Sequence, residues 1–383
     1  MKLQKKPFSC KRDGLTIRGH LLRRPGSEPL PAAILCHEFM ENQHSMARYA
    51  RTLAEAGFAA FIFDFCGGCI VGTSDGKSRN MTVLTELRDL FAVMDHVLSR
   101  ADVCAQPLVL VGGSQGGFVS AMAAAQRPQD VARLALFYPA LCIPDDARSG
   151  KLLTARIDPS NPKEIISRFP ITLGKEYALS AQKLDAYSEV RGYHGPVLLI
   201  HGTVDHMVDV AYSRRAAVQY GDTCKYIEFR YADHIFHGMY AHRAAAYLRE
   251  FACGREEVLT IDVRLETIGM EQQKTETILT LPFRAVCGTK WFRGKTEADA
   301  VDVQRWTGPK RRSACADYTL TGTDIAGAPC TIRIRNTDSG DGWKPHIETD
   351  SAALAFLNGD ACTAIVEQRG LKGPIVRIYA QIP

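Results

Sequence analysis

The segment VLVGGSQGGFVSAM, residues 109–122, places one serine between glycines, after an apolar run and before a small-residue helical pattern. A dinucleotide-binding G-x-G-x-x-G does not fit, because Ser114 or Gln115 stands where the second glycine belongs, and a phosphate-binding loop would need Lys-Ser or Lys-Thr. The segment fits G-x-S-x-G, with Gly112, Ser114 and Gly116. In that motif the serine occupies a sharp strand-to-helix turn, where crowding requires very small residues on both sides.

Length and composition limit the class of protein. The chain has 383 residues, which suggests two domains, and 23% charged residues, which is ordinary for a globular protein. The net charge of +5 is not gathered in basic runs, so we expect no nucleic-acid partner. No apolar window reaches transmembrane length, so we expect no membrane association. The first residues lack an apolar core, so we expect no secretory signal.

Cysteine usage indicates the compartment. The 12 cysteines form no disulfide framework, and Cys66-Gly67-Gly68-Cys69 has no second pair, so we interpret it as a packed or loop pair. We therefore expect a reduced, cytoplasmic setting.

Strands and helices alternate from Leu15 to about Phe251, which predicts an α/β fold with a doubly wound, mostly parallel sheet. The region from about 142 to 193 breaks the alternation with prolines and helix fragments, as expected of a lid insertion. From residue 254 the segments are short, alternating and separated by turns, which predicts an all-β barrel or sandwich over 254–383. The first domain then spans 1–253.

A serine on such a turn needs a basic partner and a carboxylate, which follow in the order Ser, Asp or Glu, His. Asp205 follows the strand GPVLLIHG, and His234 follows the strand KYIEFRYA. Both therefore lie at the strand ends where active groups gather in parallel sheets. Asp209 and His237 are the alternatives for the two roles.

An oxyanion hole needs two backbone N–H groups, one from Gln115 and one from the loop after the early strand PAAILCH. That loop begins with His37-Glu38, but a zinc-protease motif needs a second histidine at position 41, which is Glu41, and His44 is out of register. We therefore expect no metal and no cofactor.

A family resemblance rests on CHEFMENQ, FDFCGG, SDGKSRNMTVLTELRDL, GGSQGG, IPDDARSG, IHGTVDHMV and YADHIF, in this order. Together these segments resemble the bacterial cinnamoyl and feruloyl esterases, a branch of the α/β-hydrolases, over roughly the first two thirds of the chain. The resemblance implies that Ser114, Asp205 and His234 form the catalytic triad, and that the Phe39 and Gln115 N–H groups form the oxyanion hole.

The resemblance also bears on the lid and on one departure. In that family an aspartate of the lid, followed by alanine, contacts the phenolic hydroxyls of the substrate, and it matches Asp146 before Ala147. The alternative for Asp146 is a solvated loop charge. The family usually has His-Gly-Phe where this chain has His37-Glu38-Phe39, and a bulky Glu38 could narrow the acyl entrance or shift the loop.

The tail from about Glu256 resembles, more loosely, small bacterial β-barrel domains of unknown function. Trp291, Trp306 and Trp343 could line a ligand-binding barrel, pack in its core or lie at an interface. We expect the tail to support homo-oligomer formation or to pack on the hydrolase part, and to supply no catalytic group.

These observations predict a serine esterase that cleaves hydroxycinnamate esters, which are small-molecule substrates, through an acyl-enzyme. The alternatives are a general short-chain or aryl carboxylesterase, a serine peptidase of related fold, a transferase that uses an alcohol in place of water, and an inactive scaffold.

Overall fold

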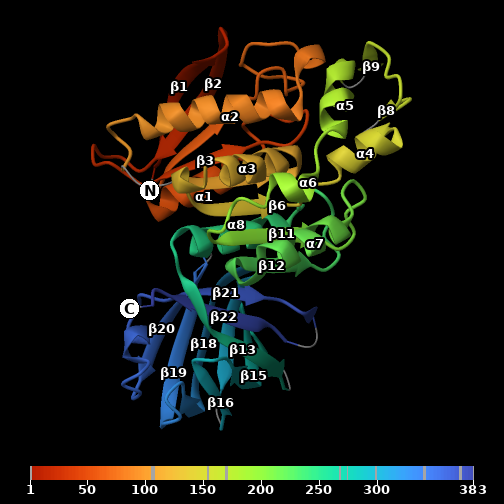
Figure 1. Ribbon diagram of the computed structural model, residues 1–383. Helices are drawn as coiled ribbons and strands as arrows, with labels where there is room; N and C mark the ends of the chain where they lie inside the picture. Colours follow the sequence, from red (N-terminus) through yellow and green to blue (C-terminus); the bar gives the residue numbers. More distant parts are fainter. Residues whose placement is uncertain are drawn as a thin grey trace. The chain divides into compact units, whose positions relative to one another are not determined.

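The computed structural model (Figure 1) describes residues 2–104, 108–152, 155–168, 171–266, 269–273, 275–297, 300–339, 342–370 and 373–382. The chain divides into two compact units, Met1–Ala252 and Cys253–Pro383.

The first unit is built on an eight-stranded sheet with the order β1-β2-β4-β3-β5-β6-β11-β12. In this spatial order, all neighbouring strands from β4 to β12 pair in parallel. At the other edge, β1 and β2 form an antiparallel hairpin, and β2 pairs antiparallel with β4. The strands of this sheet are β1 (Gln4–Arg12), β2 (Leu15–Arg23), β3 (Ala32–Cys36), β4 (Ala59–Phe63), β5 (Leu108–Gly113), β6 (Val131–Phe137), β11 (Val197–Gly202) and β12 (Cys224–Phe229). The central strands β3, β4, β5 and β11 are buried along their whole length, which explains their continuous apolar sequences.

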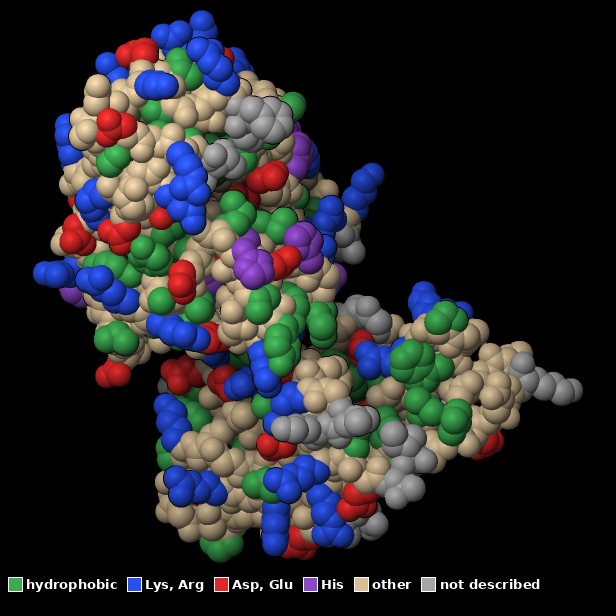
Figure 2. Space-filling model, turned by 90° about the vertical axis from the view of Figure 1, so that its right-hand side faces the viewer, with side chains coloured by type: hydrophobic (Ala, Val, Ile, Leu, Met, Phe, Trp, Pro, Cys, Tyr) green, Lys and Arg blue, Asp and Glu red, His purple; other side chains and the backbone are tan. Residues whose placement is uncertain are grey.

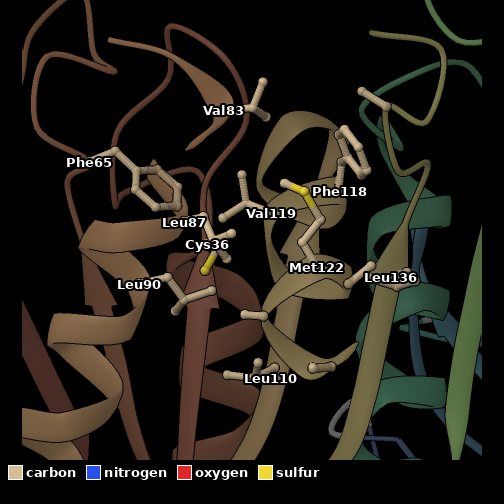
Figure 3. Packing of buried hydrophobic residues seen from close by; sticks show 14 of the residues in the cluster. Cys36, Phe65, Val83, Leu87, Leu90, Leu110, Phe118, Val119, Met122 and Leu136 are labelled. Atoms are coloured by element: carbon tan, nitrogen blue, oxygen red, sulfur yellow. The ribbon is translucent and has the colours of Figure 1, made fainter. Parts of the chain in front are cut away.

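Helices cover both faces of this sheet. The strand order reverses between β3 and β5, and because parallel crossovers are right-handed, α1 lies on the face opposite α2, α3 and α7. Figure 3 shows side chains of α2 and α3, among them Leu87, Leu90, Val119 and Met122, meeting above strands β3, β5 and β6. The helices are α1 (Ala47–Ala56), α2 (Val83–Leu98), α3 (Ser114–Gln126), α7 (Val210–Tyr220) and α8 (Met239–Ala252).

The segment between β6 and β11, where the sequence predicts a lid insertion, adds no strand to the eight-stranded sheet within the described residues. Besides helical pieces it holds two small two-stranded sheets, β7 with β8 and β9 with β10, whose strands are too short for a sequence pattern. Its elements are α4 (Ile143–Ser149), β7 (Lys151–Leu152), β8 (Ala155–Arg156), β9 (Ile165–Ser167), β10 (Leu173–Gly174), α5 (Lys175–Gln182) and α6 (Ala186–Glu189).

The second unit is a ten-stranded sheet with its own apolar core. Within it, β15, β16, β18 and β17 pair in a closed ring of four strands. Alternating burial along β15 and β19 accounts for their alternating sequences. The strands are β13 (Glu256–Leu265), β14 (Gly269–Gln272), β15 (Thr277–Gly288), β16 (Phe292–Thr296), β17 (Val301–Thr307), β18 (Lys310–Asp324), β19 (Pro329–Asp338), β20 (Trp343–Thr349), β21 (Thr363–Glu367) and β22 (Ile375–Ala380).

The surface carries mixed charge. On the face drawn in Figure 2, Lys and Arg side chains are interspersed with Asp and Glu in both units. Of the helices in the described ranges, none combines the length and the apolar character needed to cross a membrane.

Candidate active site

Ser114 occupies a strained turn between β5 and α3. Its φ is +49°, a left-handed conformation that is costly for a residue with a side chain. A Cβ at Gly112 would come within 2.3 Å of the Gly116 carbonyl oxygen, and one at Gly116 within 2.3 Å of the His37 carbonyl oxygen. The two glycines of the motif are therefore required by backbone contact, and they let the turn present Ser114.

The ends of β11 and β12 bring two further side chains to Ser114. His234 Nε2 lies 2.9 Å from Ser114 Oγ, and His234 Nδ1 lies 2.7 Å from Asp205 Oδ2. Since Asp205 is an acceptor, Nδ1 carries the imidazole proton and Nε2 is left to accept from the serine hydroxyl. The structure thus joins the three residues that the sequence singled out in one hydrogen-bonded chain.

Asp205 is held in place from several sides. Its Oδ1 accepts from the backbone N–H groups of Met207 and Val208, each at 2.9 Å, and its Oδ2 also accepts from His201 Nε2 at 3.0 Å. Burial would raise the pKa of Asp205, but the hydrogen bonds from His201 and His234 outweigh burial and hold that pKa well below its ordinary value. The carboxylate is therefore ionised and fixed in orientation.

The two alternative residues are engaged elsewhere. Asp209 is the N-cap of α7 and accepts from the Ala211 N–H at 2.8 Å. His237 has a side chain that is 68% exposed and pairs with Asp233 at 2.6 Å. Neither is hydrogen-bonded to Ser114 or His234 in the part of the chain that the structure describes.

The side chain of Gln115 is anchored to α2 and the lid. Its Nε2 donates to Glu86 Oε2 at 2.8 Å, and its Oε1 accepts from the Tyr177 hydroxyl. Burial raises the pKa of Glu86 to about 8. Glu86 belongs to the segment SDGKSRNMTVLTELRDL, so this hydrogen bond gives that segment a physical link to the Ser114 turn.

Phe39 lies on the loop after β3, which is fixed by a buried histidine. His37 Nδ1 donates to the Glu38 carbonyl oxygen at 2.7 Å, and His37 Nε2 accepts from the Phe65 N–H at 3.1 Å. Burial lowers the pKa of His37, so the ring is neutral, as these two hydrogen bonds require. Among the described residues, neither the Phe39 N–H nor the Gln115 N–H donates to another backbone carbonyl.

Glu38 does not enter the cavity beside Ser114. Its carboxylate accepts from Ser45 Oγ at 2.6 Å and from the Tyr138 hydroxyl at 3.1 Å, and it lines a separate cavity. The Tyr138 ring in turn packs on the His234 imidazole, with ring centroids 4.7 Å apart. The bulky residue at this position is therefore not among the lining residues of the cavity beside Ser114, and it anchors an aromatic ring that contacts His234.

His37, Asp64 and Cys69 form one group close enough to hold a metal ion. Asp64 Oδ2 accepts from the Thr73 N–H and hydroxyl, each at 2.7 Å, and Cys69 Sγ lies 3.4 Å from His37 Nε2. The ligand atoms are thus already engaged in hydrogen bonds that tie together the loops after β3 and β4, and we assign the group to loop structure.

A cavity of about 220 Å³ opens beside Ser114. Its lining includes Cys142, Ile143, Asp146 and Lys151 from the segment between β6 and β11, together with Phe39, Met40, Met207, Val208 and His234. Asp146 is half-buried, and burial raises the pKa of its carboxyl. The structure thus brings Asp146 and Ser114 to the same cavity.

Sequence reasoning missed three residues of this site: His201, Glu86 and Tyr138. His201 stands four residues before Asp205 at the end of β11, and Glu86 is a buried acid of α2, whose buried residues apart from Glu86 and Asp89 are apolar. Both residues could have been noticed in the sequence, because each is a polar residue within a run of residues predicted to be buried. Tyr138 follows β6 with a φ of +38°, and only the fold shows that it meets His234.

Comparison with known proteins agrees with this geometry. A hydrolase family model described as serine aminopeptidase matches residues 27–167, which include Ser114. No curated protein sequence matches the chain. Two structures of Est1E from Butyrivibrio proteoclasticus, the first with ferulic acid bound, are 27% and 25% identical to this chain, with TM-scores of 0.60 and 0.57.

Each Est1E match covers 64% of this chain, and 98% and 97% of the Est1E chains. The α/β hydrolase GrgF from Penicillium sp. is similar in fold alone, at 16% identity and a TM-score of 0.52, over 65% of this chain and 99% of GrgF. The first unit of this protein has the α/β-hydrolase fold.

Proposed function

We propose that this protein is a serine carboxylic ester hydrolase that works through an acyl-enzyme. The observation that carries the proposal is the chain of hydrogen bonds from Asp205 through His234 to Ser114, at 2.7 and 2.9 Å, beside a cavity of about 220 Å³. A serine hydroxyl is a weak nucleophile unless a neighbouring base takes its proton. His234 is oriented for that role by Asp205.

The reaction follows from these positions. His234 Nε2 takes the hydroxyl proton as Ser114 Oγ attacks the ester carbonyl carbon, and it returns the proton to the departing alcohol oxygen. Water then attacks the acyl-enzyme, losing a proton to His234, and the acid leaves as Ser114 regains its hydrogen. The N–H groups of Phe39 and Gln115 stabilise the negative oxygen of both tetrahedral intermediates. All groups in this scheme are protein groups and water, so EDTA should leave turnover unchanged.

For the substrate we propose hydroxycinnamate esters of the feruloyl, caffeoyl or coumaroyl type. Est1E, at 27% identity, has been seen with ferulic acid bound. The cavity beside Ser114 joins apolar side chains such as Ile143 and Val208 to the half-buried Asp146 carboxyl. An aromatic acyl group would fill the apolar part, and its phenolic hydroxyl would donate to Asp146.

A general short-chain or aryl carboxylesterase would use the same triad without the Asp146 contact. A serine aminopeptidase is the second candidate, because the matching family model carries that description. The cytoplasmic setting expected from the sequence stays a prediction.

The test is a substrate panel run with a covalent serine probe. A fluorophosphonate should label the protein and not the Ser114→Ala variant. Methyl ferulate should be cleaved with a higher kcat/KM than methyl cinnamate, a short-chain 4-nitrophenyl ester or an aminoacyl 4-nitroanilide. Labelling of the variant would reject the nucleophile; preference for the anilide would make the protein a peptidase, and equal turnover of all esters a general esterase.

A further inference from the structure

A second cavity, of about 80 Å³, lies wholly within the second unit. Its lining residues come mainly from β13, β15 and β17 to β22, and the apolar ones include Val263, Leu265, Leu281, Phe283 and Val376. Trp343, at the start of β20, also lines it. No step of the proposed ester hydrolysis uses this cavity.

Three polar atoms on one wall have no hydrogen-bond partner within the described ranges: Asp302 Oδ1, the Tyr318 hydroxyl and Asn336 Oδ1. The side chains of Tyr318 and Asn336 are deeply buried, with relative exposures of 4% and 2% for the residues. Buried polar groups are nearly always paired, because leaving one unpaired costs free energy. Three unpaired groups in a single cavity therefore call for a partner that enters from outside the chain.

The register of the sheet explains why these atoms converge. Asp302 on β17 and Asn336 on β19 both pair with Ala316 on β18, so the three residues form one row across the sheet. Tyr318 lies two residues after Ala316 and so points to the same face. Because Ala316 has only a methyl group, the row has polar side chains at its ends and space in its middle.

The polar atoms define the chemistry of the occupant. Asp302 Oδ2 already accepts from Gln304 Nε2 at 2.7 Å, and Oδ1 is the acceptor without a partner among the described residues. Asn336 Oδ1 is a second acceptor, and the Tyr318 hydroxyl can donate or accept. The occupant must therefore bring hydrogen-bond donors to this wall and an apolar part to the opposite walls.

We propose that this cavity is a binding site for a small compound with an apolar body, about the size of phenol, and a hydroxyl or amino head. An amino head donates to both Asp302 and Asn336, whereas a hydroxyl head, with its single hydrogen, donates to one of them and accepts from the Tyr318 hydroxyl. The body packs against Phe283 and Trp343. Phe283 and Tyr318 already meet edge to face, with ring centroids 5.2 Å apart, which gives one end of the site a fixed aromatic wall.

The three tryptophans of the protein, Trp291, Trp306 and Trp343, all belong to the second unit, and of these Trp343 lines the cavity. The experiment therefore follows the three indole N–H signals of the full-length protein by NMR, assigned by Trp→Phe substitutions. The probes are phenol, cyclohexylamine and fluorobenzene; fluorobenzene has nearly the shape of phenol but no donor. Trp343 should shift saturably with phenol or cyclohexylamine, while Trp291 and Trp306 stay nearly unchanged.

Substitutions test the polar wall. Asn336→Leu should weaken cyclohexylamine binding and Tyr318→Phe should weaken phenol binding, each by about fivefold to tenfold, the effect of one hydrogen bond. Asp360→Asn, a change at an exposed carboxyl outside the cavity, should leave binding unchanged. If Asn336→Leu does not fold, Tyr318→Phe, which keeps the ring, decides the matter.

Two outcomes would overturn the proposal. One is the absence of any saturable shift of Trp343, which would leave water as the occupant. The other is equal affinity for phenol and fluorobenzene, or affinity that the cavity substitutions do not change, because the polar wall would then play no part in recognition.

Discussion

The cavity beside Ser114 and the cavity of the second unit differ in how their polar atoms are partnered. Beside Ser114, the hydroxyl, the imidazole and the Asp205 carboxylate are hydrogen-bonded to one another. In the second unit, Asp302 Oδ1, the Tyr318 hydroxyl and Asn336 Oδ1 are buried without a partner within the described residues. A site that carries out chemistry needs its groups oriented before the substrate arrives, whereas a site that only binds can leave its polar atoms for the ligand.

The largest effect should come from Ser114→Ala. Loss of the nucleophile should lower kcat on methyl ferulate by about 10⁶, by analogy with other triads. The midpoint of thermal unfolding should barely change, because the substitution removes no contact of the apolar core. Steady-state kinetics measure the effect, with Ser99→Ala, an exposed serine at the end of α2, as control.

The shift of Trp343 by phenol should persist in Ser114→Ala; its loss would mean that the two cavities are one functional site.

Asp205→Asn should cost about 10⁴ in kcat, because His234 would lose the acceptor that fixes its tautomer. The matched control is Asp209→Asn, which keeps a side-chain oxygen that can cap α7 and should keep nearly full turnover. If Asp209→Asn were the damaging change and Asp205→Asn silent, the carboxylate would be wrongly assigned.

The residues around Ser114 are predicted well from the sequence because each of them follows the end of a strand. Gly112, Ser114 and Gly116 form a local motif, and Asp205 and His234 each follow an apolar strand, so the parallel sheet alone brings them to one edge. The doubly wound α/β fold, confirmed by the solved structures, follows from the same strand and helix periodicity. The edge strand β1 escaped prediction, because QKKPFSCKR carries the charges by which exposed edge strands avoid pairing.

The cavity of the second unit could not be predicted from sequence. Asp302, Ala316 and Asn336 lie on three strands, and only the register places them in one row. The same holds for Tyr138 and Glu38, whose contact spans 100 residues of sequence. Such tertiary contacts produce no periodic pattern in the sequence. The difference from the family at Glu38 could therefore be noted, but the contacts of its side chain could not be predicted.

Glu86 gives the first unit a dependence of stability on pH. Its pKa in the folded protein is about 8, above the ordinary value of 4.5, so the folded state binds the proton more tightly. Its contribution to the free energy of unfolding is complete below about pH 4.5 and is lost as pH rises through about 8. Relative to Glu86→Gln, the wild type should therefore lose up to about 1.4 kcal/mol per pH unit across this window.

Urea unfolding followed at the helical circular-dichroism band measures this effect, because α1 to α8 all belong to the first unit. The control is Glu176→Gln, at an exposed position on α5, which should keep the wild-type pH profile. Parallel profiles for wild type and Glu86→Gln would show that Glu86 is ionised in the folded protein throughout.

Asp146→Ala should change substrate preference more than overall rate. A hydrogen bond to a charged group is worth about 1.5–3 kcal/mol, so kcat/KM for methyl ferulate should fall by about tenfold or somewhat more, and that for methyl cinnamate should hardly fall. Asp145→Ala, at the exposed neighbour that pairs with Arg148, is the control. Equal losses on both esters would make Asp146 a structural charge of the lid.

The smallest effect should come from removing the second unit. Every group that the proposed mechanism uses precedes residue 235, and the first unit has its own sheet and its own apolar core. A chain ending at Ala252 should therefore fold and keep its kcat on methyl ferulate. Exposed strand edges suit self-association, so light scattering should show a smaller assembly or a changed solubility for the shortened chain. Circular dichroism would establish that the shortened chain is folded. A folded chain without turnover would mean that the second unit completes the active site, so that catalysis and binding are not divided between the two units.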